Sequence, residues 1–261
     1  MNIIYCYSGT GNSKKVSDEI SDKLKDCKMY SFFQNEIQYL SSCKTLGFVF
    51  SIHSLGLPRL VIKSIERMDF TNIDYIYAVA TMGGSYGIAF EQLNNILVKK
   101  GSKLSASFAL ALGSNSNIFM KIPGTSRILS EDEQENKWSK VESEINDIVN
   151  KIKMKKVNNL KPISFIFKLI SKIAHKAFIK RLPNFDKEFH TKNCNRCEVC
   201  KNNCPVNNIR IKDEGPKWLG KCEGCLRCFN ICPNESVMYG KMDNPQMYQR
   251  YQTNLNRVKK I

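Results

Sequence analysis

Eight cysteines near the end of the chain stand in two copies of one spacing, and no other feature of the sequence constrains the fold as strongly. The copies are Cys194-x-x-Cys197-x-x-Cys200-x-x-x-Cys204-Pro205 and Cys222-x-x-Cys225-x-x-Cys228-x-x-x-Cys232-Pro233. Three thiolates at i, i+3 and i+6 can wrap a compact metal cluster from a single loop. The fourth cysteine precedes a proline, which turns the chain away. The spacing therefore predicts two four-thiolate centres built by one small module.

Zinc and iron–sulfur clusters both accept four cysteines, and the spacing distinguishes them. Zinc sites typically use two separated pairs. A triple C-x-x-C-x-x-C followed by Cys-Pro is the bacterial [4Fe–4S] spacing, in which the fourth cysteine ligates the other cluster. A disulfide framework is disfavoured by the odd total of 11 cysteines. The two predicted ligand sets are Cys194, Cys197, Cys200 and Cys232, and Cys222, Cys225, Cys228 and Cys204.

The segment from Asn193 to Tyr239 resembles the bacterial two-cluster ferredoxins, and both runs are complete. The resemblance implies a small α+β domain, to which we assign residues 188–261. Between the runs, the order Ile209-Arg-Ile-Lys, Asp213-Glu-Gly-Pro and Lys217-Trp-Leu predicts a short hairpin. Such a hairpin would cover the clusters from water.

The first 155 residues alternate strand-like and helix-like segments. Compact apolar runs predict strands at residues 2–6, 28–33, 46–50, 75–80 and 104–112. Helical patterns are found at residues 14–26, 58–68, 88–100 and 131–153. Strands that alternate with helices of this length form a parallel sheet covered on both faces. The fold class we predict for this region is therefore α/β.

A loop rich in glycines and hydroxyl groups, Ser8-Gly9-Thr10-Gly11-Asn12-Ser13, directly follows the first predicted strand. At a helix N-terminus, such a loop offers several N–H and O–H donors to one anion. The Walker A spacing is absent, and Lys14 replaces the third glycine of a dinucleotide fingerprint. A turn without a ligand is the alternative. The loop resembles the phosphate loop of flavodoxins, which implies FMN and a doubly wound sheet in the order 2-1-3-4-5.

Two later loops follow the third and fourth predicted strands. In this sheet order, ligands bind at the carboxyl ends of the strands where the strand order reverses. The resemblance to flavodoxins implies that Tyr86 stacks on the flavin ring, and the alternative is a core or surface tyrosine. His53 stands where flavodoxins often place an aromatic side chain, and either contacts the flavin or lies at the surface. The predicted flavin-binding residues of these loops are Ser51, Ile52, His53, Ser54, Thr81, Met82, Gly83, Gly84, Ser85 and Tyr86.

Residues 156–187 link the two modules and carry much of the positive charge. The formal net charge is +16, yet residues 1–150 contain 16 basic and 16 acidic side chains. Residues 151–181 contain ten Lys or Arg and no Asp or Glu. Apolar residues at helical spacing predict an amphipathic helix that begins at Pro162. We expect its apolar face to pack on the two modules, and contact of residues 162–181 with an anionic membrane surface is the alternative.

The whole chain resembles the flavodoxin–ferredoxin fusion proteins of anaerobic bacteria and archaea. The resemblance implies an electron-transfer protein that carries FMN and two [4Fe–4S] clusters and passes electrons to a redox partner protein. The alternatives are a reductase, whose flavin acts on a small acceptor, and a lipid- or nucleic-acid-associated redox sensor. No catalytic residue is predicted, since three histidines give little material for an acid–base triad. We expect a cytoplasmic protein that does not bind nucleic acid, and leave its oligomeric state open.

Overall fold

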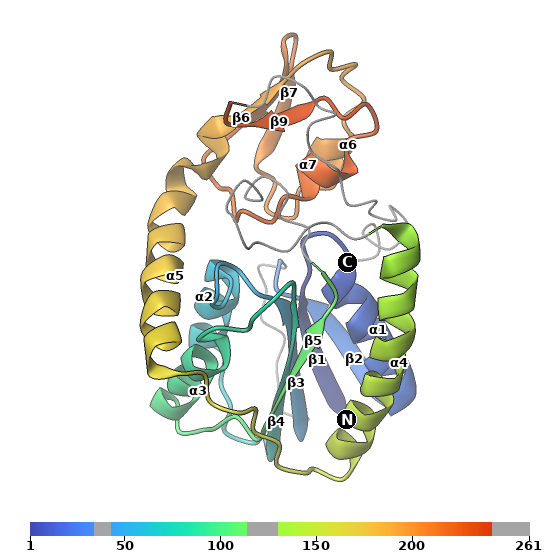
Figure 1. Ribbon diagram of the computed structural model, residues 1–261, viewed down its shortest axis with the longest axis vertical. Coiled ribbons are helices and arrows are strands. Elements are labelled where there is room, and N and C mark those ends of the chain that lie inside the picture. Colours follow the sequence, from blue (N-terminus) through green and yellow to red (C-terminus); the bar gives the residue numbers. More distant parts are fainter. Residues whose placement is uncertain (34–42, 114–129, 242–261) are drawn as a thin grey trace.

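A computed structural model describes residues 1–33, 43–113 and 130–241 of the chain. The last twenty residues of the predicted C-terminal domain, 242–261, lie outside the described residues. Figure 1 shows a large α/β unit, a smaller unit beyond one end of its sheet, and one long helix that joins them. We call residues 1–155 the sheet module and residues 186–241 the cysteine module.

The sheet module is built on five parallel strands. They are β1 (Asn2–Tyr7), β2 (Cys27–Ser31), β3 (Thr45–Ser51), β4 (Tyr75–Met82) and β5 (Ala106–Ala111). Their order is β2-β1-β3-β4-β5, and every neighbouring pair is parallel. This is the flavodoxin-like, doubly wound arrangement. The predicted fold class and strand order are confirmed.

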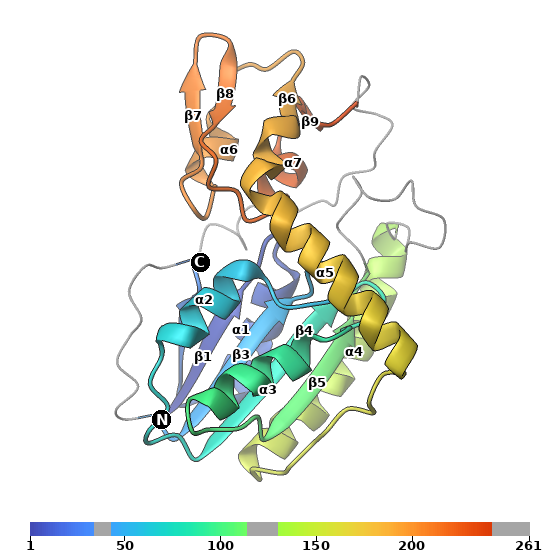
Figure 2. The same cartoon turned by 90° about the vertical axis from the view of Figure 1, so that its left-hand side faces the viewer.

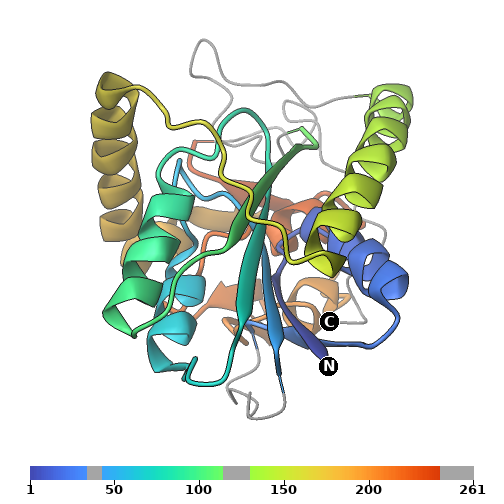
Figure 3. The same cartoon turned by 90° about the horizontal axis from the view of Figure 1, so that it is seen from below.

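Helices cover both faces of this sheet, as Figures 1 and 3 show. Helices α1 (Asn12–Leu24) and α4 (Glu131–Lys153) pack on one face, and α2 (Arg59–Arg67) and α3 (Ala89–Lys99) on the other. A hydrophobic core lies on each face of the sheet, and alternate residues of β3 belong to the two cores. Phe48 faces α2 and α3, and Val49 faces α1 and α4. Strands buried on both faces explain why the sequence shows continuous apolar runs.

The start of α1 differs from the prediction by two residues. The sequence pattern placed the first helical residue at Lys14, whereas the helix begins at Asn12. Gly11 precedes it with φ of 106°, a left-handed conformation that glycine adopts without a steric penalty. Asn12 and Ser13 therefore belong to the first turn of the helix. The predicted phosphate loop includes a helix N-terminus, and the N-cap residue there is Gly11, which has no side chain to cap it.

The cysteine module consists of short elements around a small aromatic core. A 3-10 turn η2 (Asp186–Glu188) leads into β6 (Phe189–Thr191), which pairs antiparallel with β9 (Val237–Tyr239). The predicted hairpin is present as β7 (Ile209–Lys212) and β8 (Gly215–Trp218). The helices α6 (Val199–Asn202) and α7 (Arg227–Ile231) each contain the third cysteine of a run.

The joining helix α5 (Phe165–Phe185) starts later than predicted and packs differently. The Ser164 hydroxyl accepts a hydrogen bond from the N–H of Phe167, so the helix begins after Ser164 instead of at Pro162. Figure 2 shows α5 on the outside of the molecule, beyond α2 and α3.

The prediction that the apolar face of α5 packs on both modules is wrong for its first half. Ile166, Ile170 and Ile173 are 72%, 51% and 63% exposed, whereas the polar Ser171 and His175 are buried. Apolar residues occur around most of this half of the helix, so periodicity alone did not identify the inward face. Among the described residues, no helix combines the length and apolar character needed to cross a membrane.

Candidate cofactor-binding sites

The structure brings the eight cysteines together in two crossed groups. Cys200 is buried, which raises the pKa of its thiol to about 11, and the neighbouring thiols that raise it further are Cys232, Cys194 and Cys197. In the other group, burial raises the pKa of Cys228, and Cys222, Cys225 and Cys204 raise it further. Each group thus contains three cysteines of one run and the fourth cysteine of the other. These are the two predicted ligand sets.

The two runs fold as an internal repeat with an offset of 28 residues. In the first run, N–H groups of Arg196 and Asn208 donate to the Sγ atoms of Cys194 and Cys204, at 3.4 and 3.2 Å. In the second run, the equivalent N–H groups of Gly224 and Ser236 donate to Cys222 and Cys232, at 3.3 and 3.2 Å. Donors aimed at cysteine sulfurs stabilise thiolates and help to set cluster potentials.

The backbone that aims these donors is also repeated. Non-glycine residues at equivalent positions take left-handed φ angles, with Glu198 at 61° and Leu226 at 57°, and Asn207 at 49° and Glu235 at 50°. Such angles are uncommon outside glycine and curl the chain tightly. The donor set, eight thiols with N–H groups directed at sulfur, therefore fits two four-cysteine clusters.

None of the cysteines forms a disulfide. In the described part of the chain, no group of three or more His, Cys, Asp or Glu side chains converges on a position for a single metal ion.

The three predicted flavin loops meet at the carboxyl edge of the sheet. The Ser13 and Thr81 hydroxyls are 2.8 Å apart and hydrogen bonded, and the N–H of Ile52 donates to the Thr81 carbonyl at 3.0 Å. The Ser8 hydroxyl accepts a hydrogen bond from the N–H of Gly11. Thr81 therefore ties the loop at residues 8–13 to the other two. The helix N-terminus, the hydroxyls and the glycines suit the phosphate of FMN.

A tight turn shapes the loop after β3. The N–H groups and carbonyls of His53 and Gly56 bond to each other at 2.9 and 3.1 Å, and Ser54 and Leu55 between them have φ of 45° and 64°. The α5 side chain His175 lies against Gly56, where an added Cβ would be 2.5 Å from Nδ1 of His175. That Nδ1 is 3.0 Å from the carbonyl oxygen of His53. The linker helix thus packs on a predicted flavin loop, which sequence analysis did not foresee.

His53 lies among aromatic rings and is partly buried. Its ring makes edge contacts with Tyr7 and Phe178, at centroid distances of 5.3 and 5.8 Å. Its Nδ1 atom is buried and has no hydrogen-bond partner. Desolvation, with a smaller contribution from His175, lowers the pKa of His53 to about 4. His53 is therefore neutral at pH 7, with an unpaired ring nitrogen close to the candidate flavin loops.

Tyr86 and the glycines of the loop after β4 occupy its outer part. The Tyr86 ring packs on Phe90 at 5.5 Å, and its hydroxyl donates to the carbonyl of Lys161 at 2.6 Å. Gly84 is exposed, and an added Cβ there would meet nothing within 4 Å. The linker therefore fixes the tyrosine that the resemblance assigns to ring stacking.

Arg227 of the cysteine module binds the candidate phosphate loop directly. Its guanidinium donates to the carbonyls of Ser8 and Gly9 at 2.6 and 2.7 Å, and to that of Asn203 at 3.2 Å. The Arg227 side chain is buried, with 5% of the residue exposed. Sequence reasoning missed this residue, because no local pattern marks a contact between positions 218 residues apart.

A second set of contacts holds the two modules together. Arg59, the first residue of α2, pairs with Glu223 at 2.9 Å and donates to the carbonyl of Cys222 at 3.1 Å. Gly9 lies so close to Cys225 that an added Cβ would be 2.6 Å from its carbonyl oxygen. The cysteine group that contains Cys225 therefore lies against the loop predicted to hold the flavin phosphate.

No protein-family model matches this chain, and no curated protein matches it. The chain is similar to solved structures with a flavodoxin fold. A Fusobacterium nucleatum flavodoxin mutant bound to flavin mononucleotide is 22% identical, with 59% of this chain and 95% of that one covered and a TM-score of 0.40. A two-electron reduced Megasphaera elsdenii flavodoxin is 17% identical, with 44% and 89% covered and a TM-score of 0.37. Rubredoxin oxygen:oxidoreductase of Desulfovibrio gigas is 16% identical, with 59% and 36% covered and a TM-score of 0.34.

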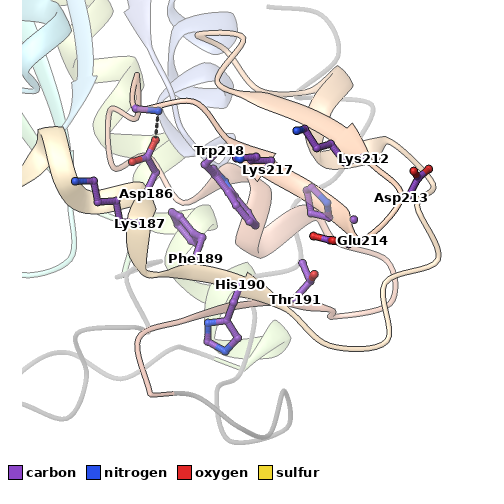
Figure 4. Close-up of a pocket in the computed structure, with 13 residues that line it drawn as sticks. Asp186, Lys187, Phe189, His190, Thr191, Lys212, Asp213, Glu214, Lys217 and Trp218 are labelled. Carbon is purple, nitrogen blue, oxygen red and sulfur yellow. Dashed lines mark hydrogen bonds between the residues drawn. The ribbon is translucent and has the colours of Figure 1, made fainter.

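A cavity of about 610 Å³ opens in the cysteine module between β6 and the β7–β8 hairpin, as Figure 4 shows. Phe189 and Trp218 stack in its wall at a centroid distance of 5.2 Å. Asp186, also in the wall, accepts hydrogen bonds from Asn208 and the N–H of Gly220. Trp218 packs in the same core as Cys222, Cys228 and Cys232.

We expect Gly9→Ala to push the two modules apart at this contact and to lower the stability of the protein. We expect Gly84→Ala to leave the stability unchanged. The alanine Cβ at position 9 would overlap the Cys225 backbone, which cannot rotate away, whereas position 84 faces open space. Overpacking of this kind typically costs about 1–3 kcal/mol. Thermal unfolding of the anaerobic proteins would measure the difference, and equal midpoints for the two variants would contradict the close contact.

We expect His53 to make the protein less stable at acid pH. Its pKa in the folded protein is about 4, against an ordinary value of 6.5, so between these values the unfolded state binds more protons. Stability is complete above pH 6.5 and falls as the pH drops toward 4, by up to about 3 kcal/mol. His53→Phe keeps an aromatic ring and removes this loss.

The measurement compares thermal unfolding midpoints at pH 7.0 and 5.5 under anaerobic conditions. His53→Phe should lose less stability between the two pH values than the unchanged protein. His190→Gln is the control, because His190 is exposed on β6. If His53→Phe and His190→Gln show the same drop, the buried neutral state of His53 is wrong.

Proposed function

We propose that this protein transfers electrons between two [4Fe–4S] clusters in the cysteine module and FMN in the sheet module, and exchanges them with a redox partner protein. The observation that carries the proposal is the contact of Cys225 with Gly9. It puts a ligand of one candidate cluster against the candidate flavin phosphate loop. Electron carriers in one chain exchange electrons without having to meet by diffusion.

The groups at the two candidate sites suit the cofactors. Two crossed sets of four thiols, with repeated N–H donors at sulfur, support [4Fe–4S] clusters. The helix N-terminus after Gly11, whose N-cap residue is a glycine without a capping side chain, supports a phosphate. FMN supplies a carrier that holds one or two electrons, whereas each cluster passes one at a time.

The residues of the chain serve this function by fixing and shielding the cofactors. Arg227 and Arg59 hold the modules in contact, and Arg227 places a buried positive charge beside the second group of cysteines. That charge favours the thiolate form of Cys225 and lowers its pKa, against a larger increase from burial. Phe189 and Trp218 form an aromatic wall that limits access of water to the cysteines.

Cofactor analysis of the anaerobically purified protein tests the proposal. We expect about eight irons, about eight sulfides and one FMN per chain, with the visible and EPR spectra of [4Fe–4S] clusters. Protein that contains zinc in place of iron, or that cannot be reconstituted with FMN, would contradict it. Turnover of a small acceptor without any protein partner would instead favour the reductase alternative.

A further inference from the structure

Large apolar side chains cover the outward face of the first half of α5. Nine exposed large hydrophobic residues occur in the described part of the chain, and five of them lie in a nine-residue stretch. An apolar patch of this density at a protein surface marks an interaction site. The residues and their exposed fractions are Phe165 (81%), Ile166 (72%), Leu169 (52%), Ile170 (51%) and Ile173 (63%). We call these five residues the outer patch.

The outer patch is exposed although α5 is well packed on its other side. Ser171 and His175 are buried on that inward side, and the Ser54 hydroxyl donates to the carbonyl of Ala174 at 3.3 Å. Lys168 forms an ion pair with Glu91 of α3 at 2.6 Å. These contacts fix the rotation of the helix, so the outer patch points away from the sheet module. Figures 1 and 2 show α5 at the edge of the molecule with its outer side uncovered.

The surroundings of the outer patch are positively charged. Lys172 stands beside Ile173, Lys176 and Lys180 follow one and two turns later, and all three are exposed. None of them pairs with a carboxylate among the residues that the structure describes. Lys168 and Arg181 of the same helix are paired with Glu91 and Glu188, so the three exposed lysines supply the net positive charge beside the outer patch. A partner for this surface must combine negative charge with an apolar interior.

We propose that α5 lies on the surface of an anionic lipid bilayer, with the outer patch inserted below the headgroups and the lysines among the lipid phosphates. The patch side chains protrude from a convex helix, which suits fluid acyl chains more than a rigid partner surface. A second copy of the chain would bring the exposed Lys172, Lys176 and Lys180 close to the same three lysines of its partner. Amphipathic helices with apolar and lysine-rich faces bind anionic membranes in this way. This inference does not depend on the cofactors.

Vesicle sedimentation with the anaerobically purified, full-length protein tests the proposal. We expect binding to vesicles that contain about 30% phosphatidylglycerol and much less to pure phosphatidylcholine vesicles. Salt at about 0.5 M should weaken the binding, since it screens the lysines. Equal binding to both kinds of vesicle, or no binding to the anionic vesicles at low salt, would overturn the proposal.

Matched substitutions assign the binding to α5. Phe165→Gln or Ile173→Gln should weaken it about ten-fold or more, whereas Met154→Gln, at a residue that is 65% exposed at the end of α4, should leave it unchanged. The pair Lys172→Gln and Lys176→Gln should weaken it roughly 30-fold. The control pair is Lys25→Gln, at the end of α1, and Lys28→Gln, on the edge strand β2; both lysines are exposed and neither belongs to α5.

All the altered side chains are exposed, so the variants should fold. If the controls weaken binding as much as the α5 variants, the outer patch is not the site and the proposal is wrong. If sedimentation velocity shows a dimer that Phe165→Gln dissociates, the patch binds a second copy and the proposal is overturned.

Discussion

We expect Cys204→Ala and Cys222→Ala to lose the same cluster and to retain the one predicted at Cys194, Cys197, Cys200 and Cys232. We expect Cys232→Ala and Cys194→Ala to retain the cluster predicted at Cys222, Cys225, Cys228 and Cys204. The structure groups Cys204 with the second run and Cys232 with the first. Loss of one thiolate ligand empties one site, so each variant should retain about four of about eight irons. Iron analysis and the EPR spectra of the reduced variants measure the result.

The test depends on which variants give the same EPR spectrum. If each run held its own cluster, the EPR spectrum of Cys204→Ala would match that of Cys194→Ala instead of that of Cys222→Ala. Cys27→Ala is the control, because Cys27 is the first residue of β2, at the amino end of the sheet, and its neighbours Ser21, Asp26 and Cys43 all belong to the sheet module. It should retain all the iron, and a loss of iron from this variant would mean that altered folding contributes to the result.

Arg227→Ala should loosen the cysteine module from the candidate phosphate loop. The substitution removes two hydrogen bonds between the modules and leaves the buried carbonyls of Ser8 and Gly9 without a partner. Hydrogen bonds from a buried charged group are worth about 1.5–3 kcal/mol each. We therefore expect amide hydrogen exchange at residues 8–13 to accelerate on the order of 100-fold, and the affinity for FMN to fall.

Arg196→Ala is the matched control for Arg227→Ala. Arg196 belongs to the first run, is exposed, and makes one long hydrogen bond to the carbonyl of Asp213 within its own module. Its loss should leave exchange at residues 8–13 unchanged. Equal exchange in the two variants would show that Arg227 does not hold the modules together.

The sheet and the cysteine groups could be predicted because local sequence determines them. Apolar runs such as Phe48–Phe50 reflect burial on both faces of a parallel sheet. The repeated spacing of the cysteines places three of them in each loop, and the two ligand sets derived from it stay a prediction. The hairpin followed from the turn residues between Lys212 and Gly215.

The contacts between the modules could not be predicted, because they join distant parts of the chain. Arg227 has no periodicity or motif of its own, and its partners are determined only when both modules are folded. The prediction of which face of α5 packs inward was wrong for a related reason. Ser171 and His175 face inward because the helix contacts the loop after β3: Ser54 bonds to the carbonyl of Ala174, and Gly56 packs on His175. The isoleucines of the same half remain exposed.

The internal repeat of the cysteine module gives the proposed electron path an outer end and an inner end. Cys197 is exposed, whereas its counterpart Cys225 is half-buried and lies against Gly9. Val199 stands in the first run where the second run has Arg227. One half of a nearly symmetric unit thus faces outward, where a visiting protein can reach it, and the other faces the flavin loop. In the proposed electron transfer, the first run exchanges electrons with the partner protein and the second run with the flavin. Equivalent substitutions in the two runs should therefore have unequal effects on the rates of these two steps.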